Sequence, residues 1–477
     1  MPSVNKASLR EELDILKKQL NEQIAAGKMA PEVQSLVRAL LSIVSILVAV
    51  FMEKNTRKTS KNSSLPSSQT GKDNSALGQG AKGKGPKQKE GGVGNTRTVK
   101  TTETLRVDQC SCCGKDISTE KCSSKEKRVK IDIIFEKSVD EKVAEVKVCP
   151  DCKTETKADF PSDYQGPLQY GVGVKAYVLN LLMAQMVSLN RIQKMMKTLI
   201  NVSISEATIL KYVLQLHQSL EKWEASSVDQ LMSQPTLHVD ETSIRVNKKN
   251  YWVHVCSGGD ITLKKMHSSR GREAIEENGI IPNYEGVVIH DCWKSYLSYH
   301  QCGHGLCGSH LLRELTFIVE ANGYSWAKNM KIALLKICKE VSSRESKKLD
   351  DQEYANLQKR YRNILTRGEK EMPEIPEKPS GKRGRIAKSD AHNLWERLRD
   401  HETAVLLFAK EAHVPFTNNR AERDLRMGKV KQKVSGCFRE ERYAHAFCRI
   451  SSYLQTMTAK GQNPLVAIQA ALMGNMV

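Results

Sequence analysis

The chain has 477 residues and a formal net charge of +20, because 74 Lys and Arg residues outnumber 54 Asp and Glu residues. This length allows two or three domains with a large buried core. The charge favours a polyanionic partner through counterion release, with a merely basic soluble protein as the alternative. Thirteen cysteines and no cleavable signal peptide predict reduced thiols and metal ligation in a cytosolic setting, rather than disulfides.

Residues 1–53 are predicted to be helical. Leu9, Leu13, Leu16 and Leu20 are spaced by four, three and four residues, which is a heptad seam. The segment Ala39–Met52 follows without a charge, but a membrane-spanning helix needs about twenty apolar residues. We therefore expect a coiled-coil oligomerisation region and no membrane anchor. The alternative is a hairpin that folds back on the same chain.

Two segments of different character follow. Residues 54–100 are rich in Ser, Gly, Lys and Asn, which predicts a flexible basic linker. Residues 101–160 hold two C-x-x-C pairs with strand-like alternation between them, and two such pairs can bring four thiolates to one tetrahedral zinc ion. The expected ligands of this structural zinc are Cys110, Cys113, Cys149 and Cys152, with Cys112 as the competitor for either of the first two.

Residues 165–230 show helical periodicity, with Val174, Val178 and Leu181 on one apolar stripe. Ser205 is a suitable N-cap for a helix that begins at Glu206. A helix, a short polar turn and a second helix can form a helix-turn-helix that reads DNA. Two packed helices without a ligand would give the same pattern, so both interpretations stay open.

From residue 235 the pattern changes to short apolar strands. We expect an antiparallel meander, then a helix, then a further strand, and later a helical insertion at about residues 324–410 with a Pro/Gly/Lys-rich loop at 367–388. The predicted strands are Leu237–Asp240, Ser243–Val246, Tyr251–Cys256, Ile261–Met266, Val287–His290 and Leu306–Cys307, and the predicted helices are Arg272–Glu277 and Leu311–Ala321. This order of elements is that of an α/β ribonuclease-H-like fold, assigned to residues 235–450.

Three acids in this region can converge. Asp240 and Asp291 each end an apolar run, which places them at the carboxyl ends of buried strands, and Glu422 lies on a later helix. Three converging carboxylates indicate a divalent-metal site, and in a basic protein the expected substrate is a phosphodiester. Glu241 is excluded, because alternation along a strand turns it to the opposite face.

The helix that carries Glu422 also carries cations at helical spacing. Arg426, Lys429 and Lys433 follow Glu422 at intervals of four, three and four residues, so they share one face. They could hold phosphates on either side of a scissile bond. A surface salt-bridge array is the alternative.

Histidines and cysteines near the acids give weaker signals. A second zinc site is one interpretation of Cys302, His304, Cys307 and His310, but their spacing is irregular and the last two also fit a strand-helix corner. His238 and His290 are expected to be packed strand histidines rather than catalytic bases.

These motifs resemble the transposases of the insertion-sequence-66 family over nearly the whole chain. The matching motifs are Asn62–Ser68 (with one proline missing), the cysteine module, Val239-Asp240-Glu241-Thr242, His290-Asp291, Leu306-Cys307 with His310–Arg313, Val414-Pro415, Asn418–Arg423, and a tail domain at residues 451–477. Gly308 departs from the pattern, because the family usually has tryptophan there.

The resemblance implies a DNA transposase with an acidic D-D-E triad and two magnesium or manganese ions. Asp240 would bridge the ions, and Asp291 and Glu422 would each hold one. Such an enzyme cleaves DNA at element ends and joins the 3′-hydroxyl to target DNA, in a bacterial cytoplasm, as a homo-oligomer and with accessory proteins in some relatives. The expected DNA contacts are Arg313, Arg420, Arg423, Arg426, Lys429 and Lys433. The alternatives are a non-transposing nuclease of the same fold and an inactive DNA-binding protein.

Overall fold

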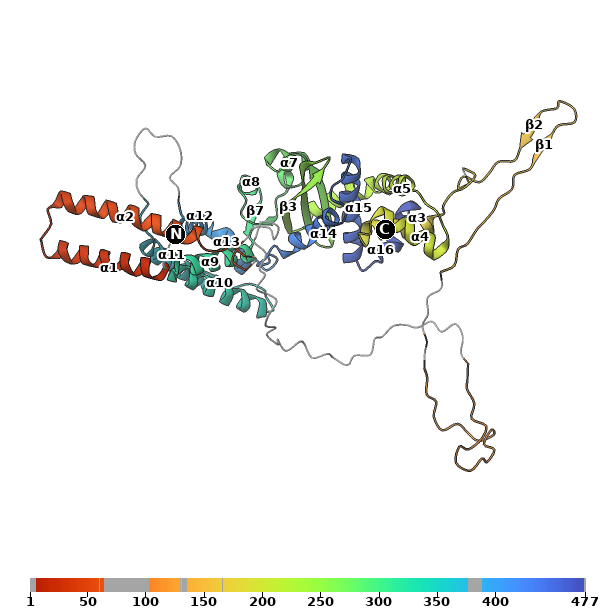
Figure 1. The fold of residues 1–477 in the computed structure, drawn as a ribbon, viewed down its shortest axis with the longest axis horizontal. Helices are drawn as coiled ribbons and strands as arrows, with labels where there is room; N and C mark the ends of the chain where they lie inside the picture. Colours follow the sequence, from red (N-terminus) through yellow and green to blue (C-terminus); the bar gives the residue numbers. More distant parts are fainter. Residues whose placement is uncertain are drawn as a thin grey trace. The chain divides into compact units, whose positions relative to one another are not determined.

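The computed structural model describes residues 6–59, 61–63, 103–128, 130, 135–164, 166–375 and 388–475. The chain divides into a small unit, residues 73–140, and a large unit made of residues 1–72 and 141–477. Most of the predicted linker and most of the strand-like segment at 129–133 lie outside the described residues. All named helices and strands belong to the large unit (Figure 1).

The N-terminal helices α1 (Lys6–Ala25) and α2 (Pro31–Lys54) form a hairpin (Figure 1). Leu13 is buried, whereas Leu16 of the predicted seam is 52% exposed. The longer exposed apolar row is on α2 and consists of Val33, Leu36, Leu40, Ile43, Leu47 and Phe51. By length and composition alone, α2 could also cross a membrane, a property that core helices of soluble proteins share.

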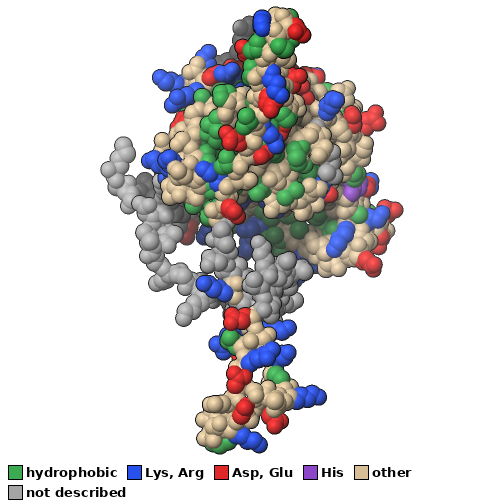
Figure 2. Space-filling model, turned by 90° about the vertical axis from the view of Figure 1, so that its right-hand side faces the viewer, with side chains coloured by type: hydrophobic (Ala, Val, Ile, Leu, Met, Phe, Trp, Pro, Cys, Tyr) green, Lys and Arg blue, Asp and Glu red, His purple; other side chains and the backbone are tan. Residues whose placement is uncertain are grey.

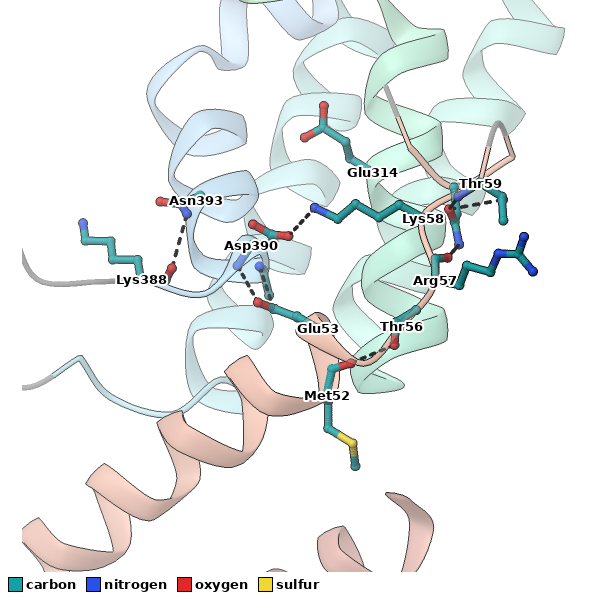
Figure 3. Close-up of polar contacts among 12 residues, drawn as sticks. Met52, Glu53, Thr56, Arg57, Lys58, Thr59, Glu314, Lys388, Asp390 and Asn393 are labelled. Atoms are coloured by element: carbon teal, nitrogen blue, oxygen red, sulfur yellow. Dashed lines mark hydrogen bonds and ion pairs between the residues drawn. The ribbon is translucent and has the colours of Figure 1, made fainter. Parts of the chain in front are cut away.

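The C-terminal end of α2 docks on the helical insertion. The Glu53 carboxylate accepts hydrogen bonds from the backbone N–H groups of Asp390 at 2.7 Å and Ala391 at 3.1 Å, and so caps helix α12 (Asp390–Asp400). Lys58 forms an ion pair with Asp390 at 2.9 Å (Figure 3). Asn322 donates a hydrogen bond to the Ala49 carbonyl. The C-terminal end of α2 is therefore anchored to the helical insertion.

The helical region between residues 172 and 232 matches the predicted pattern. Ser205 caps α5 as expected, because its hydroxyl accepts a hydrogen bond from Thr208 N at 3.0 Å. Asn201 ends α4 in the left-handed conformation, with φ of 51°. The elements are α3 (Val172–Leu179), a π-helical turn (Asn180–Ala184), α4 (Leu189–Ile200), α5 (Glu206–Ser219) and α6 (Glu221–Met232).

A five-stranded mixed sheet forms the centre of the large unit. Its order is β5-β4-β3-β6-β7, with β3, β4 and β5 antiparallel and with β6 and β7 parallel to β3. The strands are β3 (Thr236–Val246), β4 (Lys249–Gly258), β5 (Ile261–His267), β6 (Val287–His290) and β7 (Gly303–Leu306). The prediction for β6 is confirmed. The predicted break after Asp240 is wrong, because β4 pairs with β3 as far as Val246.

Helices cover both faces of this sheet. One face packs against α14 (Asn419–Ser435) and α15 (Glu441–Ala459) (Figure 1). Asp240 is on this face, because His238, two residues earlier on β3, contacts Asn418 at the start of α14. The opposite face is covered by α7 (Arg272–Asn278), a 3-10 turn (Ile281–Asn283) and α8 (Lys294–Leu297). Helix α16 (Pro464–Leu472) and α15 share one core with α3 and α5, and the expected boundary at residue 451 falls inside α15.

The remaining helices form a second core next to β7. They are α9 (Gly308–Asn322), α10 (Ser325–Ser343), α11 (Asp351–Glu371), α12 and α13 (Glu402–Lys410). Helix α11 continues past the expected start of the loop at residue 367, and residues 376–387 lie outside the described part. A small antiparallel pair, β1 (Val146–Val148) with β2 (Glu155–Lys157), completes the elements of the large unit.

Candidate active site

The three acids predicted to act together come from three elements. Asp240 lies within β3, Asp291 directly follows β6, and Glu422 lies in the first turn of α14. The parallel register of β3 and β6 pairs His238 with Ile289. Asp240 and Asp291 each follow this pair by two residues, so they are neighbours at the same end of the sheet.

The electrostatics of Asp240 show that the acids share one field. Burial raises the pKa of Asp240 well above its ordinary value, and the charges of Glu241, Asp291 and Glu422 raise it further. Burial and the charge of Glu241 also raise the pKa of Asp291. Glu422 Oε1 is buried without a hydrogen-bond partner among the described residues. Crowded carboxylates gain by binding a hard divalent cation, so this donor set fits magnesium or manganese.

Asn418 fixes the position of α14 relative to the sheet. Its side-chain nitrogen donates to the Val239 carbonyl at 2.8 Å, its side-chain oxygen contacts His238 Nδ1 at 2.9 Å, and its backbone N–H donates to Cys307 Sγ at 3.1 Å. Asn418 is 1% exposed, so each of these bonds is protected from water. The first turn of α14, with Glu422, is thereby held to β3 and to the start of α9. The sequence motif contained Asn418 but did not indicate this role.

A histidine and an arginine of α9 lie beside Glu422. His310 Nδ1 is 3.5 Å and Arg313 Nη2 is 3.7 Å from Glu422 Oε1. Burial, followed by the charges of Arg313 and Arg397, lowers the pKa of His310 to about 4, so this histidine is neutral near pH 7. Ligand atoms of Cys307, His310 and Glu422 lie within 4.8 Å of one another. The group is chemically able to hold a metal ion.

Cys302 and His304, considered above together with Cys307 and His310, have different partners. His304 contacts His290 Nε2 at 3.1 Å and the Tyr299 carbonyl at 2.9 Å. Cys302 Sγ donates to the same carbonyl at 3.4 Å. His290 is 0% exposed, as expected of a packed strand histidine. The structure therefore groups Cys307 and His310 with Glu422, and not with Cys302 and His304.

The helical insertion also contributes a cation that the sequence did not indicate. Arg397 of α12 pairs with Glu314 of α9. Although burial opposes it, the charges of Glu314, Cys292 and Asp291 raise the pKa of Arg397. Packing between helices thus brings Arg397 within electrostatic range of Asp291, which no local pattern predicts.

The six cations expected to contact DNA do not form one face. Arg420 donates to the Ile261 carbonyl at 3.1 Å, and Lys429 donates to the Ser243 carbonyl at 2.5 Å, so both side chains bind the sheet. Arg423, Arg426 and Lys433 are exposed, and Arg313 faces Glu422. On the face shown in Figure 2, Lys and Arg side chains are interspersed with Asp and Glu side chains.

The two cysteine knuckles have the same local geometry, although they belong to different units. Cys110 N donates to Lys115 O and Gly114 N donates to Cys110 O, both at 2.9 Å. Cys149 N donates to Thr154 O at 2.9 Å and Lys153 N donates to Cys149 O at 3.0 Å. This shared turn makes Cys113, and not Cys112, the equivalent of Cys152.

Hydrogen bonds also prepare two of these thiols to ionise. Backbone N–H groups of Cys113 and Cys112 lower the pKa of Cys110. The hydroxyl and backbone N–H of Thr154 lower the pKa of Cys152 to about 7. Thiolates are the form that binds zinc, so the donor set within each knuckle suits that metal.

A mixed α/β chain with buried, crowded carboxylates flanked by arginines has the features of an enzyme that processes nucleic acid. The sequence model of the transposase IS66 family matches residues 167–446, so the chain belongs to this family. Membership implies a DNA-processing enzyme that binds DNA. The matched range includes Asp240, Asp291 and Glu422 and begins after the cysteine knuckles. The comparison with curated proteins gives no match.

Proposed function

We propose that the chain is a D-D-E transposase with a ribonuclease-H-like core, which cleaves DNA at the ends of an insertion sequence and joins the freed 3′-hydroxyl to target DNA. The observation that carries this proposal is the shared field of Asp240, Asp291 and Glu422, at the point where β6 ends beside β3. The strand order β5-β4-β3-β6-β7, with the first acid on β3 and the second after β6, supports the fold assignment.

The residues of the site have different proposed roles. Asp240, Asp291 and Glu422 would hold two magnesium or manganese ions, which when bound activate the attacking oxygen and stabilise the leaving one. Asn418 keeps Glu422 at a fixed distance from β3. Arg313 balances part of the negative charge beside Glu422. The protein thus supplies an arrangement of ligands that exists before DNA arrives.

DNA contacts are assigned by exposure. Arg423, Arg426 and Lys433 project from α14 into solvent and are the proposed phosphate contacts on that side of the acids. Arg420 and Lys429 are proposed instead to hold α14 against the sheet, because each donates to a strand carbonyl. On α4, Arg191, Lys194 and Lys197 are exposed and offer a further basic surface.

The remaining expectations concern metal and assembly. One structural zinc on Cys110, Cys113, Cys149 and Cys152 would join the two knuckles. A homo-oligomer would form through the exposed apolar row of α2, whose residues from Val33 to Leu47 alternate intervals of three and four, as in helices that pair with a second copy. The proposed setting is the bacterial cytoplasm, on DNA.

The test uses full-length protein and DNA that carries the sequences flanking its own gene. Asp240→Asn, Asp291→Asn and Glu422→Gln should each bind this DNA but give no cleaved or joined product in magnesium. Glu440→Gln is the matched control, because Glu440 is an exposed acid paired with Arg442. Normal joining by any triad variant would remove that residue from the site. Cleavage without joining by wild type would favour a nuclease, and binding without cleavage would favour a DNA-binding protein.

A further inference from the structure

On the side of the sheet opposite to the face that carries Asp240, the side chain of Arg270 is held between two tryptophan rings. The Arg270 guanidinium carbon lies 4.9 Å from the ring centre of Trp252 and 4.5 Å from that of Trp293. Trp252 belongs to β4, and Trp293 follows Asp291 by two residues. Both contacts are within the distance at which a guanidinium is attracted to a ring face. The cation is therefore fixed in a stack directly beside one of the acids.

Glu241 determines the orientation of this arginine. Its side chain is 1% exposed, and its Oε1 accepts hydrogen bonds from Arg270 Nε at 2.8 Å and Nη2 at 2.5 Å. Its Oε2 accepts a hydrogen bond from the Tyr296 hydroxyl at 2.6 Å. Both oxygens are thus in use, so Glu241 is placed to position Arg270 rather than to bind a metal ion.

The arginine is held close to the strands that carry two of the acids. Glu241 follows Asp240 directly on β3 and turns to the other face of that strand. The backbone N–H of Trp293 donates a hydrogen bond to Asp291 Oδ1 at 3.1 Å. The stack is therefore connected to the positions of both Asp240 and Asp291.

Arg270 also remains accessible. Its side chain is 42% exposed, although two rings and a carboxylate hold it. The two hydrogen bonds to Glu241 use Nε and Nη2, and Nη1 takes part in neither. A guanidinium whose rotamer is already fixed loses little entropy when it binds an anion. Arg270 therefore has the exposure and the rigidity of a preformed phosphate-binding group.

We propose that Arg270, positioned by Glu241 and stacked between Trp252 and Trp293, binds a backbone phosphate of the DNA strand that enters the active site. This assignment rests on the proposed function. Asp240 and Glu241 point to opposite faces of β3, so Arg270 lies on the other side of this strand from α14, which carries Glu422 and the exposed Arg423 and Arg426. The strand would be held by phosphates on both sides of the reacting bond.

The experiment combines salt dependence with neutralised phosphates. Arg270→Met should lower the slope of log K against log salt for duplex DNA by about 0.9, the loss of one phosphate contact. The matched control Arg272→Met should keep the wild-type slope, because Arg272 is exposed and pairs with Glu276. Duplexes with single methylphosphonates near the cleaved bond are then compared in cleavage rate. One position should slow wild type by about tenfold to a hundredfold and leave Arg270→Met unchanged.

Two further variants separate contact from folding. Arg270→Lys keeps the charge but lacks the planar fork, so it should retain the salt slope and part of the methylphosphonate effect. Glu241→Gln should retain the slope and cleave more slowly at saturating DNA. The proposal is overturned if wild type cleaves DNA and if both Arg270→Met and Arg270→Lys show the wild-type salt slope and the full methylphosphonate sensitivity of wild type. If wild type does not cleave, the proposed function fails, whereas the salt slope still decides whether Arg270 binds phosphate.

Discussion

Lys264 is a buried cation whose removal should stabilise the protein at neutral pH. It lies on β5, is 3% exposed, and its Nζ has Ser451 Oγ at 3.3 Å as a partner. Burial lowers the pKa of Lys264 from its ordinary 10.5 to about 8, against the opposing charges of Cys448 and Asp424. This difference corresponds to about 3 kcal/mol of destabilisation while the side chain is charged. Lys264→Met fills a similar volume without the charge, so its free energy of unfolding at pH 7 should exceed that of wild type by up to this amount.

The pH dependence gives the sharper test. Between pH 8 and 10.5 the unfolded chain binds the Lys264 proton and the folded chain does not, so this group adds stability to wild type as pH rises through that window. Urea unfolding of both proteins from pH 7 to 10.5 should therefore show the advantage of Lys264→Met shrinking toward zero. Comparing the two proteins at each pH cancels the titration of groups that the charge of Lys264 does not influence. Burial of the charged Lys264 side chain is expected to destabilise the folded protein. This expectation would be refuted if Lys264→Met were less stable than wild type at pH 7, or if the difference in stability between the two proteins did not change with pH.

Three other predictions test separate parts of the chain. A Cβ on Gly308 would lie 2.3 to 2.6 Å from three ring atoms of Phe416, so Gly308→Ala should lower the free energy of unfolding by about 1–3 kcal/mol. In urea unfolding, Phe416→Leu should restore part of this loss when it is combined with Gly308→Ala. If the effects of the two substitutions are strictly additive, the clash is contradicted. Full-length protein should contain one zinc by metal analysis, which Cys152→Ser should lose and Cys122→Ser should keep; equal zinc in both would exclude Cys152 as a ligand. Leu40, 59% exposed on α2, should support assembly, so Leu40→Glu should reduce the mass measured by light scattering, and an unchanged mass would rule out this face.

Local patterns were sufficient for elements whose cause is local. Val287–His290 is an apolar run that forms β6 with the predicted bounds, and Asp291 follows it directly. Ser205 caps α5 because a hydroxyl next to the first turn is all that a cap requires. The predicted strands Tyr251–Cys256 and Ile261–Met266 lie within β4 and β5 for the same reason.

Features that depend on a distant partner could not be predicted in this way. The polar residues after Asp240 predict a break in β3, but β4 pairs with them and continues the strand. Helical spacing places Lys429 on the same face as Glu422, yet the side chain reaches the Ser243 carbonyl on the sheet. Arg397 approaches Asp291 only through packing of the helical insertion. In each case the residue type is known from the sequence, whereas the direction in which the side chain or strand continues depends on a tertiary contact.

The positions of positive charges near the acids bear directly on the proposed reaction. Three arginines lie near the acids, namely Arg270 from the loop before α7, Arg313 of α9 and Arg397 of α12. The pKa values of Asp240 and Asp291 nevertheless stay raised. Arg270 offsets part of the negative charge at Asp291, while burial is the largest cause of the raised pKa of both acids. In the proposed reaction, divalent cations would bind the carboxylates, whereas the bordering arginines would attract phosphates. Full neutralisation by the protein would weaken metal binding, and no arginines would leave DNA repelled by the acids, so the proposed reaction requires this intermediate balance.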